Sequence, residues 1–174
     1  MYIDAGKGQN PANINSGFIF IMTEPEQATI GWREWAALPE LNLPAIKAKI
    51  DTGARTSALH AFLIEPYTRE GIDILRFLIH PIQHNQDFEV ECHAPVFDFR
   101  EVTDSGGHRE MRYVIQSKVV LGENAWPIEL TLTNRDTMRF RMLLGRRAME
   151  HRFVVDPGAS YINGKLRPRK LYGL

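Results

Sequence analysis

The chain has 174 residues, of which 44% are hydrophobic and 24% charged, so it is long enough to bury the core of one globular domain. Its 21 basic and 21 acidic residues cancel, which excludes a strong general attraction to nucleic acid or to an anionic membrane. A single cysteine excludes an internal disulfide framework and fits a reducing compartment, so we expect a cytoplasmic protein.

The predicted elements follow a leader. Residues 1–23 are rich in Gly, Asn, Ser and Pro and are predicted to be flexible, whereas residues 24–174 are predicted to form a single domain with a basic C-terminal tail. No apolar run is long enough to span a membrane, and no membrane partner is expected. Short apolar or alternating segments predict strands at residues 30–38, 45–51, 57–65, 72–80, 88–94, 96–102, 111–121, 128–133, 139–144 and 153–156.

Helical periodicity is scarce, and only residues 146–151 predict a helix, a short one. Many short strands with frequent turns indicate an all-β protein that closes into a barrel or forms a sandwich. From residue 146 onward, seven basic residues stand against two acidic ones. We interpret this tail as a solvated rim, with an acidic partner as the alternative and nucleic acid as a weak third candidate.

One turn carries the main chemical signal. An apolar-leaning segment that ends at Ile50 leads directly into Asp51-Thr52-Gly53-Ala54. A carboxylate can take a proton from water while a neighbouring carboxylic acid protonates the carbonyl oxygen of an amide. Two adjacent carboxyls supply both forms, because like charges so close together cannot both ionise cheaply. Since the chain offers one such turn, the pattern predicts a catalytic pair formed by two copies.

The surrounding residues fit the same chemistry. Gly53 permits a tight turn and the close approach of a partner backbone, and the Thr52 hydroxyl can bond across the pairing. Far downstream, the apolar residues 142–144 run into Gly145-Arg146. The alternative for residues 51–53 is an ordinary β-turn with an Asx-type hydrogen bond.

Three stretches of the chain resemble the retropepsin-like aspartic proteases of bacteria and archaea, a family often labelled as ATP-dependent zinc proteases. The stretches are residues 31–35 (Gly-Trp-Arg-Glu-Trp), 46–61 and 138–149. The resemblance implies a closed acid-protease barrel and an aspartic endopeptidase that acts as a homodimer without a metal or organic cofactor. By position, Asp51 would be catalytic, and its loop would be supported by Thr52, Gly53, Ala54, Gly145 and Arg146.

The same resemblance suggests a substrate. Relatives are often associated with ATP-grasp enzymes that ligate glutamate onto peptides or proteins, which implies an acidic or Glu-rich peptide or protein. In the similar retroviral proteases, an acidic residue follows Asp-Thr-Gly-Ala and pairs with the arginine of Gly-Arg. This chain departs from that retroviral pattern, because it has Arg55 at the position of the acidic partner for Arg146. These like charges predict an anion-binding rim, with further candidates at Arg112, Arg139, Arg141 and Arg147.

Two other acidic turns compete with Asp51. Asp104-Ser105-Gly106-Gly107 follows no apolar strand directly, so we interpret it as a mobile hairpin that covers substrate, with Gly106 and Gly107 as candidate substrate-binding residues. Asp156-Pro157-Gly158 follows an apolar run, but Pro157 offers neither a hydroxyl nor an amide hydrogen. Asp156 is therefore interpreted as structural or as a partner for an arginine.

Two functions from other classes stay open, a barrel that binds peptides without a productive aspartate pair and a zinc-dependent hydrolase. Zinc ligands would have to come from His80, His84, Cys92 and His93, but Pro81 argues against a helix there and neighbouring strand residues point to opposite faces. Cys92 is also a candidate nucleophile, with His93 or His108 as its base, although such a cysteine is more often a small core residue. No Walker-type loop supports ATP binding.

Overall fold

The structure, a computed structural model, describes residues 27–103, 106–134 and 139–174. The predicted leader, the pair Asp104-Ser105 and residues 135–138 lie outside these ranges. Strands dominate the described chain: β1 (Ala28–Gly31), β2 (Arg33–Leu38), β3 (Leu43–Asp51), β4 (Ser57–His60), β5 (Phe62–Arg69), β6 (Ile72–Ile79), β7 (Val90–Pro95), β8 (Asp98–Thr103), β9 (Arg109–Leu121), β10 (Asn124–Thr133), β11 (Met142–Gly145) and β12 (Phe153–Asp156).

Three short helical segments accompany these strands. Helix α1 (Arg146–Met149) lies where the sequence predicts the one short helix. The 3-10 helix η1 (Pro39–Leu41) and helix α2 (Pro168–Leu171) are additional, and both begin with proline, whose fixed φ suits a first helical position. None of the helices that the structure describes is long and apolar enough to cross a membrane.

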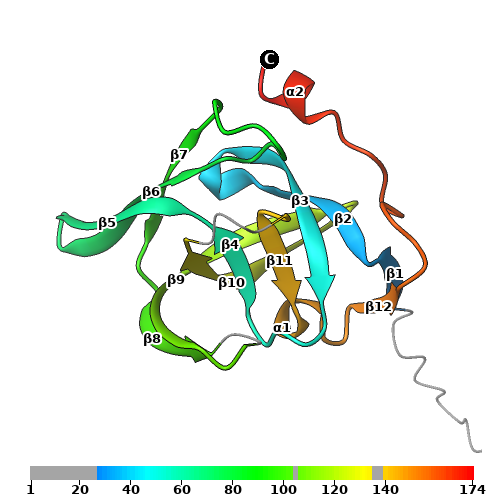
Figure 1. The fold of residues 1–174 in the computed structure, drawn as a ribbon, viewed down its shortest axis with the longest axis horizontal. Coiled ribbons are helices and arrows are strands. Elements are labelled where there is room, and N and C mark those ends of the chain that lie inside the picture. Colours follow the sequence, from blue (N-terminus) through cyan, green and yellow to red (C-terminus); the bar gives the residue numbers. More distant parts are fainter. Residues whose placement is uncertain (1–26, 104–105, 135–138) are drawn as a thin grey trace, which may run out of the picture.

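Six strands form a nearly closed ring in the order β10, β4, β11, β3, β2 and β9, and a β10–β9 pairing returns to the start (Figure 1). The contact between β2 and β9 is narrow, with a single register pair, Ala37 opposite Val120. Strand β8 precedes β9 in the chain, pairs with it as an antiparallel hairpin and extends this sheet by one strand. The closed all-β architecture predicted from the sequence is therefore confirmed.

Successive residues of β3 face alternately the core and the outer surface of the barrel. Ile46, Ala48 and Ile50 are buried in the ring with residues of the other strands. Lys49 is exposed and Asp51 half-buried on the opposite face, as the two-residue period of a strand requires. The same alternation therefore builds the barrel wall and directs Asp51 away from the core.

A second sheet of three antiparallel strands, β5, β6 and β7, is inserted between β4 and β8 (Figure 1). Its inner face joins the main core through Leu75, Phe77 and Cys92. Its outer face carries polar side chains. The insertion therefore adds to the core without interrupting the ring.

Long-range contacts split two of the predicted strands. The segment predicted at 30–38 is broken at Trp32, whose N–H donates to the carbonyl of Ala159 at 3.0 Å. The segment predicted at 57–65 is broken at Ala61, whose N–H donates to the carbonyl of Thr133 at 3.1 Å. Each break lets the chain leave one sheet for another.

The C-terminal segment returns to the barrel. Strand β12 pairs in parallel with β1, outside the ring. Further on, the Tyr172 hydroxyl donates to the carbonyl of Ala45 at 2.7 Å, and its ring packs against Phe88 at 5.2 Å between centroids. Burial raises the pKa of Tyr172 well above its usual value. The basic tail is thus anchored by its aromatic residue, while most of its charged side chains stay exposed.

Candidate active site

Asp51 is the last residue of β3 and begins the turn that follows. Its Oδ1 accepts hydrogen bonds from the N–H groups of Gly53 and Ala54, both at 3.1 Å. This Asx-type hydrogen bonding is what the alternative interpretation of residues 51–53 as an ordinary β-turn predicts, and it leaves Oδ2 of the carboxylate outside the turn's two bonds. The two donors fix the direction of a half-buried carboxylate at the end of β3.

Strand β11 runs parallel to β3 (Figure 1). Their register places Gly145 directly opposite Asp51. Beyond this pair, the N–H of Arg146 donates to the Ala54 carbonyl at 2.8 Å, and the N–H of Arg147 donates to the Arg55 carbonyl at 3.1 Å. The start of α1 therefore holds the Asp51 turn through backbone hydrogen bonds.

Gly145 is required by this close approach. A Cβ at this position would lie 2.5 Å from the carbonyl carbon and 2.7 Å from the carbonyl oxygen of Thr56. The N–H of Gly145 donates to Ser57 Oγ at 3.0 Å, which adds a further tie to the same loop. A larger residue would push the loop away from β11.

Arg146 has a partner other than the acidic residue of the retroviral pattern. Its Nη1 donates to the carbonyl of Thr52 at 3.0 Å, and its Nε lies 3.9 Å from Glu150 Oε1. The guanidinium therefore holds the Asp51 turn through a main-chain oxygen. Arg55, at the position of the expected acid, is exposed.

Of the residues predicted to bind substrate, Gly106, Gly107 and Arg112 lie on the β8–β9 hairpin, whereas Arg55 lies between β3 and β4. Gly106 and Gly107 are exposed near the tip of the hairpin, and Gly107 has a φ of 83°, in the left-handed region that favours glycine. Arg112 lies further along β9 and is buried, with Nε bonded to Glu110 Oε2 at 2.9 Å.

The predicted anion-binding rim is divided by the structure. Arg112 and Arg139 line one cavity, whereas Arg147 lines another with Thr56 and Ser57. Arg141 is buried and Arg55 exposed. The five arginines named from the sequence therefore do not form one continuous rim.

A basic face on β2 and β3 was missed by the sequence reasoning. Arg33 lies directly opposite Lys49, and Lys47 is the next outward residue of β3. Burial lowers the pKa of Lys47, and the positive charges of Arg33 and Arg139 lower it further. Like charges directly opposite each other, such as Arg33 and Lys49, destabilise a sheet. A negatively charged group bound to this face would offset their repulsion. The alternation of Lys47 and Lys49 with apolar residues was the available signal.

The competing acidic turns differ from the Asp51 turn. Asp156 is exposed, and its Oδ1 accepts the N–H of Gly158 at 2.8 Å in a turn of the same kind. It lies opposite Gly31 in the β1–β12 pair, outside the ring. Asp104 and Ser105 lie outside the described residues.

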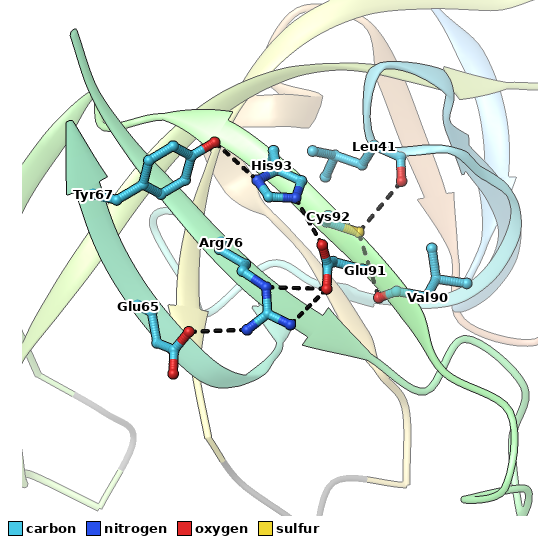
Figure 2. A network of polar contacts seen from close by, with 8 residues as sticks. All are labelled: Leu41, Glu65, Tyr67, Arg76, Val90, Glu91, Cys92 and His93. Carbon is cyan, nitrogen blue, oxygen red and sulfur yellow. Dashed lines mark hydrogen bonds and ion pairs between the residues drawn. The ribbon is translucent and has the colours of Figure 1, made fainter. Parts of the chain in front are cut away.

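Cys92 does not have the surroundings of a nucleophile. It is 1% exposed, and its Sγ donates to the carbonyl of Leu41 at 3.3 Å (Figure 2). Burial, with a smaller contribution from Glu91, raises the pKa of Cys92 to about 12, so the reactive thiolate is disfavoured. His93 points to the opposite face, where its ring nitrogens lie 3.0 Å from the Tyr67 hydroxyl and from Glu91 Oε1.

The other two histidines suggested as zinc ligands are His80 and His84, and the structure does not bring them together with Cys92 and His93 as a metal site. His80 stacks on Phe62 at 4.5 Å between ring centroids, and its Nδ1 lies 3.3 Å from the Phe88 carbonyl. His84 is exposed. Within the described part of the chain, no group of three or more His, Cys, Asp or Glu is placed to hold a metal ion.

Comparison with known proteins identifies the family. Residues 29–166 match the family described as "RimB-like: Retropepsin-like aspartic endopeptidase RimB". The chain belongs to this RimB-like family. Membership confirms the resemblance drawn from the sequence, because the family is described as one of retropepsin-like aspartic endopeptidases.

Similar proteins extend this result. A relative from Shewanella pealeana is 49% identical over 148 residues, and one from Parasynechococcus marenigrum is 50% identical over 142 residues. Both are named "Probable alpha-L-glutamate ligase", and the matches cover 83% and 82% of this chain. They cover 32% and 30% of the relatives, so the chain spans about a third of their length.

The fold of this RimB-like chain also occurs in a solved structure. The crystal structure of Lpg0085, a protein of unknown function from Legionella pneumophila, superposes with a TM-score of 0.66 at 29% sequence identity. The superposition covers 79% of this chain and 99% of the other.

Proposed function

We propose that this chain hydrolyses peptide bonds with a water molecule activated by two Asp51 residues, one from each copy of a homodimer. One carboxylate accepts a proton from the water while the other, protonated, donates to the carbonyl oxygen of the scissile bond. The observation that carries the proposal is the Asp51 turn itself, clamped between its own N–H donors and the start of α1. Such rigidity suits a pair that must share one proton.

Thr52, Gly53 and Ala54 are proposed to shape this turn, and Gly145 and Arg146 to hold it. Thr52 and Gly53 are exposed, so a second copy can approach the turn there. Membership of the RimB-like family supports these roles, because the family is one of retropepsin-like aspartic endopeptidases.

An acidic peptide or protein is the proposed substrate. The outer face of β2 and β3 beside Asp51 carries Arg33, Lys47 and Lys49, and Arg139 lies close enough to lower the pKa of Lys47. Clustered cations of this kind attract and orient carboxylates. The names of the relatives from Shewanella and Parasynechococcus point to glutamate as the acidic residue.

The test compares wild-type protein with Asp51→Asn on a library of Glu-rich peptides between about pH 4 and about pH 8, with and without a chelator. We expect cleavage that resists the chelator and falls by about 10²–10⁴-fold in the variant, the range of general acid–base catalysis. Asp156→Asn is the matched control, because Asp156 forms the same kind of turn outside the ring, and it should keep full activity.

Cleavage that survives Asp51→Asn would eliminate Asp51 as the catalyst. Cleavage abolished by the chelator would support the zinc-dependent alternative. Peptide binding without any cleavage would favour the non-catalytic barrel.

A further inference from the structure

A cavity of about 400 Å³ opens on the face of the barrel that carries Asp51. Lys49 and Leu143 line it, and they lie opposite each other in the β3–β11 pairing, each two residues before the Asp51–Gly145 pair. Residues two apart on a strand point to the same face, about 7 Å apart. The cavity therefore lies next to Asp51, because the residues that line it on β3 and β11 are the nearest residues on the same face.

The walls of the cavity are of two kinds. Trp32, Phe140 and Leu143 supply apolar surface, whereas Lys49, Arg112 and Arg139 supply positive charge. Among the described residues that line it, none is acidic. An aliphatic stem that ends in a carboxylate matches this combination, while a small inorganic anion would leave the apolar walls uncovered.

Arg112 is the buried cation of the set. It is 7% exposed, and its Nε bonds to Glu110 Oε2 at 2.9 Å, but its buried Nη2 has no hydrogen-bond partner among the described residues. The buried Oγ1 of Thr133, which lines the same cavity, also lacks one there. Buried polar atoms are rarely left unpaired, and a buried charge that is only partly compensated favours an anion nearby.

We propose that this cavity is the subsite for an acidic side chain beside the scissile bond, and that Arg112 determines the specificity for a carboxylate. The inference rests on the proposed function and makes it more specific. The apolar walls hold the methylene groups of a glutamyl side chain, and Arg112, with Lys49 and Arg139 nearer to solvent, receives its carboxylate. A glutaminyl side chain has the same shape but carries no negative charge to pair with the guanidinium, so its bond to Arg112 is weaker.

The test uses pairs of peptides that differ only in Glu or Gln at one residue flanking the cleaved bond. We expect wild-type kcat/KM to favour the Glu peptide by about 10–100-fold, the equivalent of one hydrogen bond to a charged group. Arg112→Met should lower kcat/KM for the Glu peptide by about that factor and leave the Gln peptide nearly unchanged. Arg69→Met, at an exposed arginine of β5, is the control and should change neither.

Two further measurements keep the proposal testable if Arg112→Met fails to fold. Arg139→Met removes an exposed cation of the cavity and should also reduce the preference for Glu. Calorimetric binding of uncleaved Glu and Gln peptides tests the subsite separately from catalysis. If neither peptide is cleaved, the proposed function fails, and the subsite stands or falls on whether the Glu peptide binds more tightly. Equal cleavage and equal binding of the two peptides by wild-type protein, or a parallel loss of both in Arg112→Met, would overturn the subsite.

Discussion

Asp51 owes its position to short-range bonds that the sequence already implies. An aspartate followed by threonine and glycine closes an Asx-type turn, and the N–H groups of Gly53 and Ala54 complete it. What the sequence does not reveal is the partner of Arg146. The carbonyl of Thr52 takes the place of an acidic side chain, so Arg55 is compatible with the loop.

At the same scale, Gly145→Ala is expected to be strongly destabilising. The added methyl group would lie 2.5 Å from the backbone of Thr56, which cannot rotate away as a flexible side chain can. Overpacking of this kind typically costs about 1–3 kcal/mol, and we expect at least that loss in the free energy of unfolding measured with urea.

Gly158→Ala is the matched control for that measurement. A Cβ there meets only the Asp156 side chain, at 3.3 Å, and neither glycine has a positive φ. A Gly145→Ala protein as stable as the Gly158→Ala protein would show that the loop is not fixed by this contact.

Among the elements, β2 joins the C-terminal segment to the barrel through one buried side chain. Glu34 is 0% exposed, and its carboxylate accepts the N–H groups of Gly31 at 2.7 Å, Ile162 at 2.9 Å and Asn163 at 3.3 Å. One donor precedes β2 in the chain, and the other two follow β12. Glu34 therefore fastens β1 and the residues after β12 to the same strand.

Glu34→Gln should consequently destabilise the protein. An amide keeps the size of the side chain but exchanges a charged acceptor for an NH₂ donor that faces buried N–H groups. We expect a loss of about 1–3 kcal/mol in urea unfolding. Glu65→Gln is the control, because Glu65 is exposed and its ion pair with Arg76, screened by solvent, should contribute little (Figure 2). Equal effects of the two substitutions would contradict the role of Glu34.

Most elements could be predicted from local pattern, and the exceptions have long-range causes. Alternation locates β3, β9 and β12 closely, because one face of each meets the core. The breaks at Trp32 and Ala61 depend on carbonyls more than 70 residues away in the sequence, Ala159 and Thr133, which no local pattern encodes.

The same limit applies to the candidate site. The Asp51 turn could be predicted from the sequence because its residues are contiguous. The cavity beside it combines side chains of β3, β9 and β11, so its composition follows only from strand register. Arg112 was identified as a binding candidate by its charge, whereas Lys49 and Trp32 were not identified at all.

On the scale of the whole molecule, one nearly closed ring presents one clamped Asp51 turn and one basic face. Asp156, the other described aspartate that follows an apolar strand, lies outside the ring. The proposed shared-proton mechanism takes its second carboxylate from a second copy of the chain. The central claim of this account is that both aspartates of such a pair are required.

The most direct measurement is the activity of a mixed dimer, with one wild-type and one Asp51→Asn subunit, isolated through two different tags. We predict that it is as inactive as the Asp51→Asn homodimer, while a mixed dimer that carries Asp156→Asn in one subunit keeps full activity. If the mixed Asp51→Asn dimer retains about half of the wild-type activity, each subunit of a symmetric pair works alone and the shared dyad is contradicted.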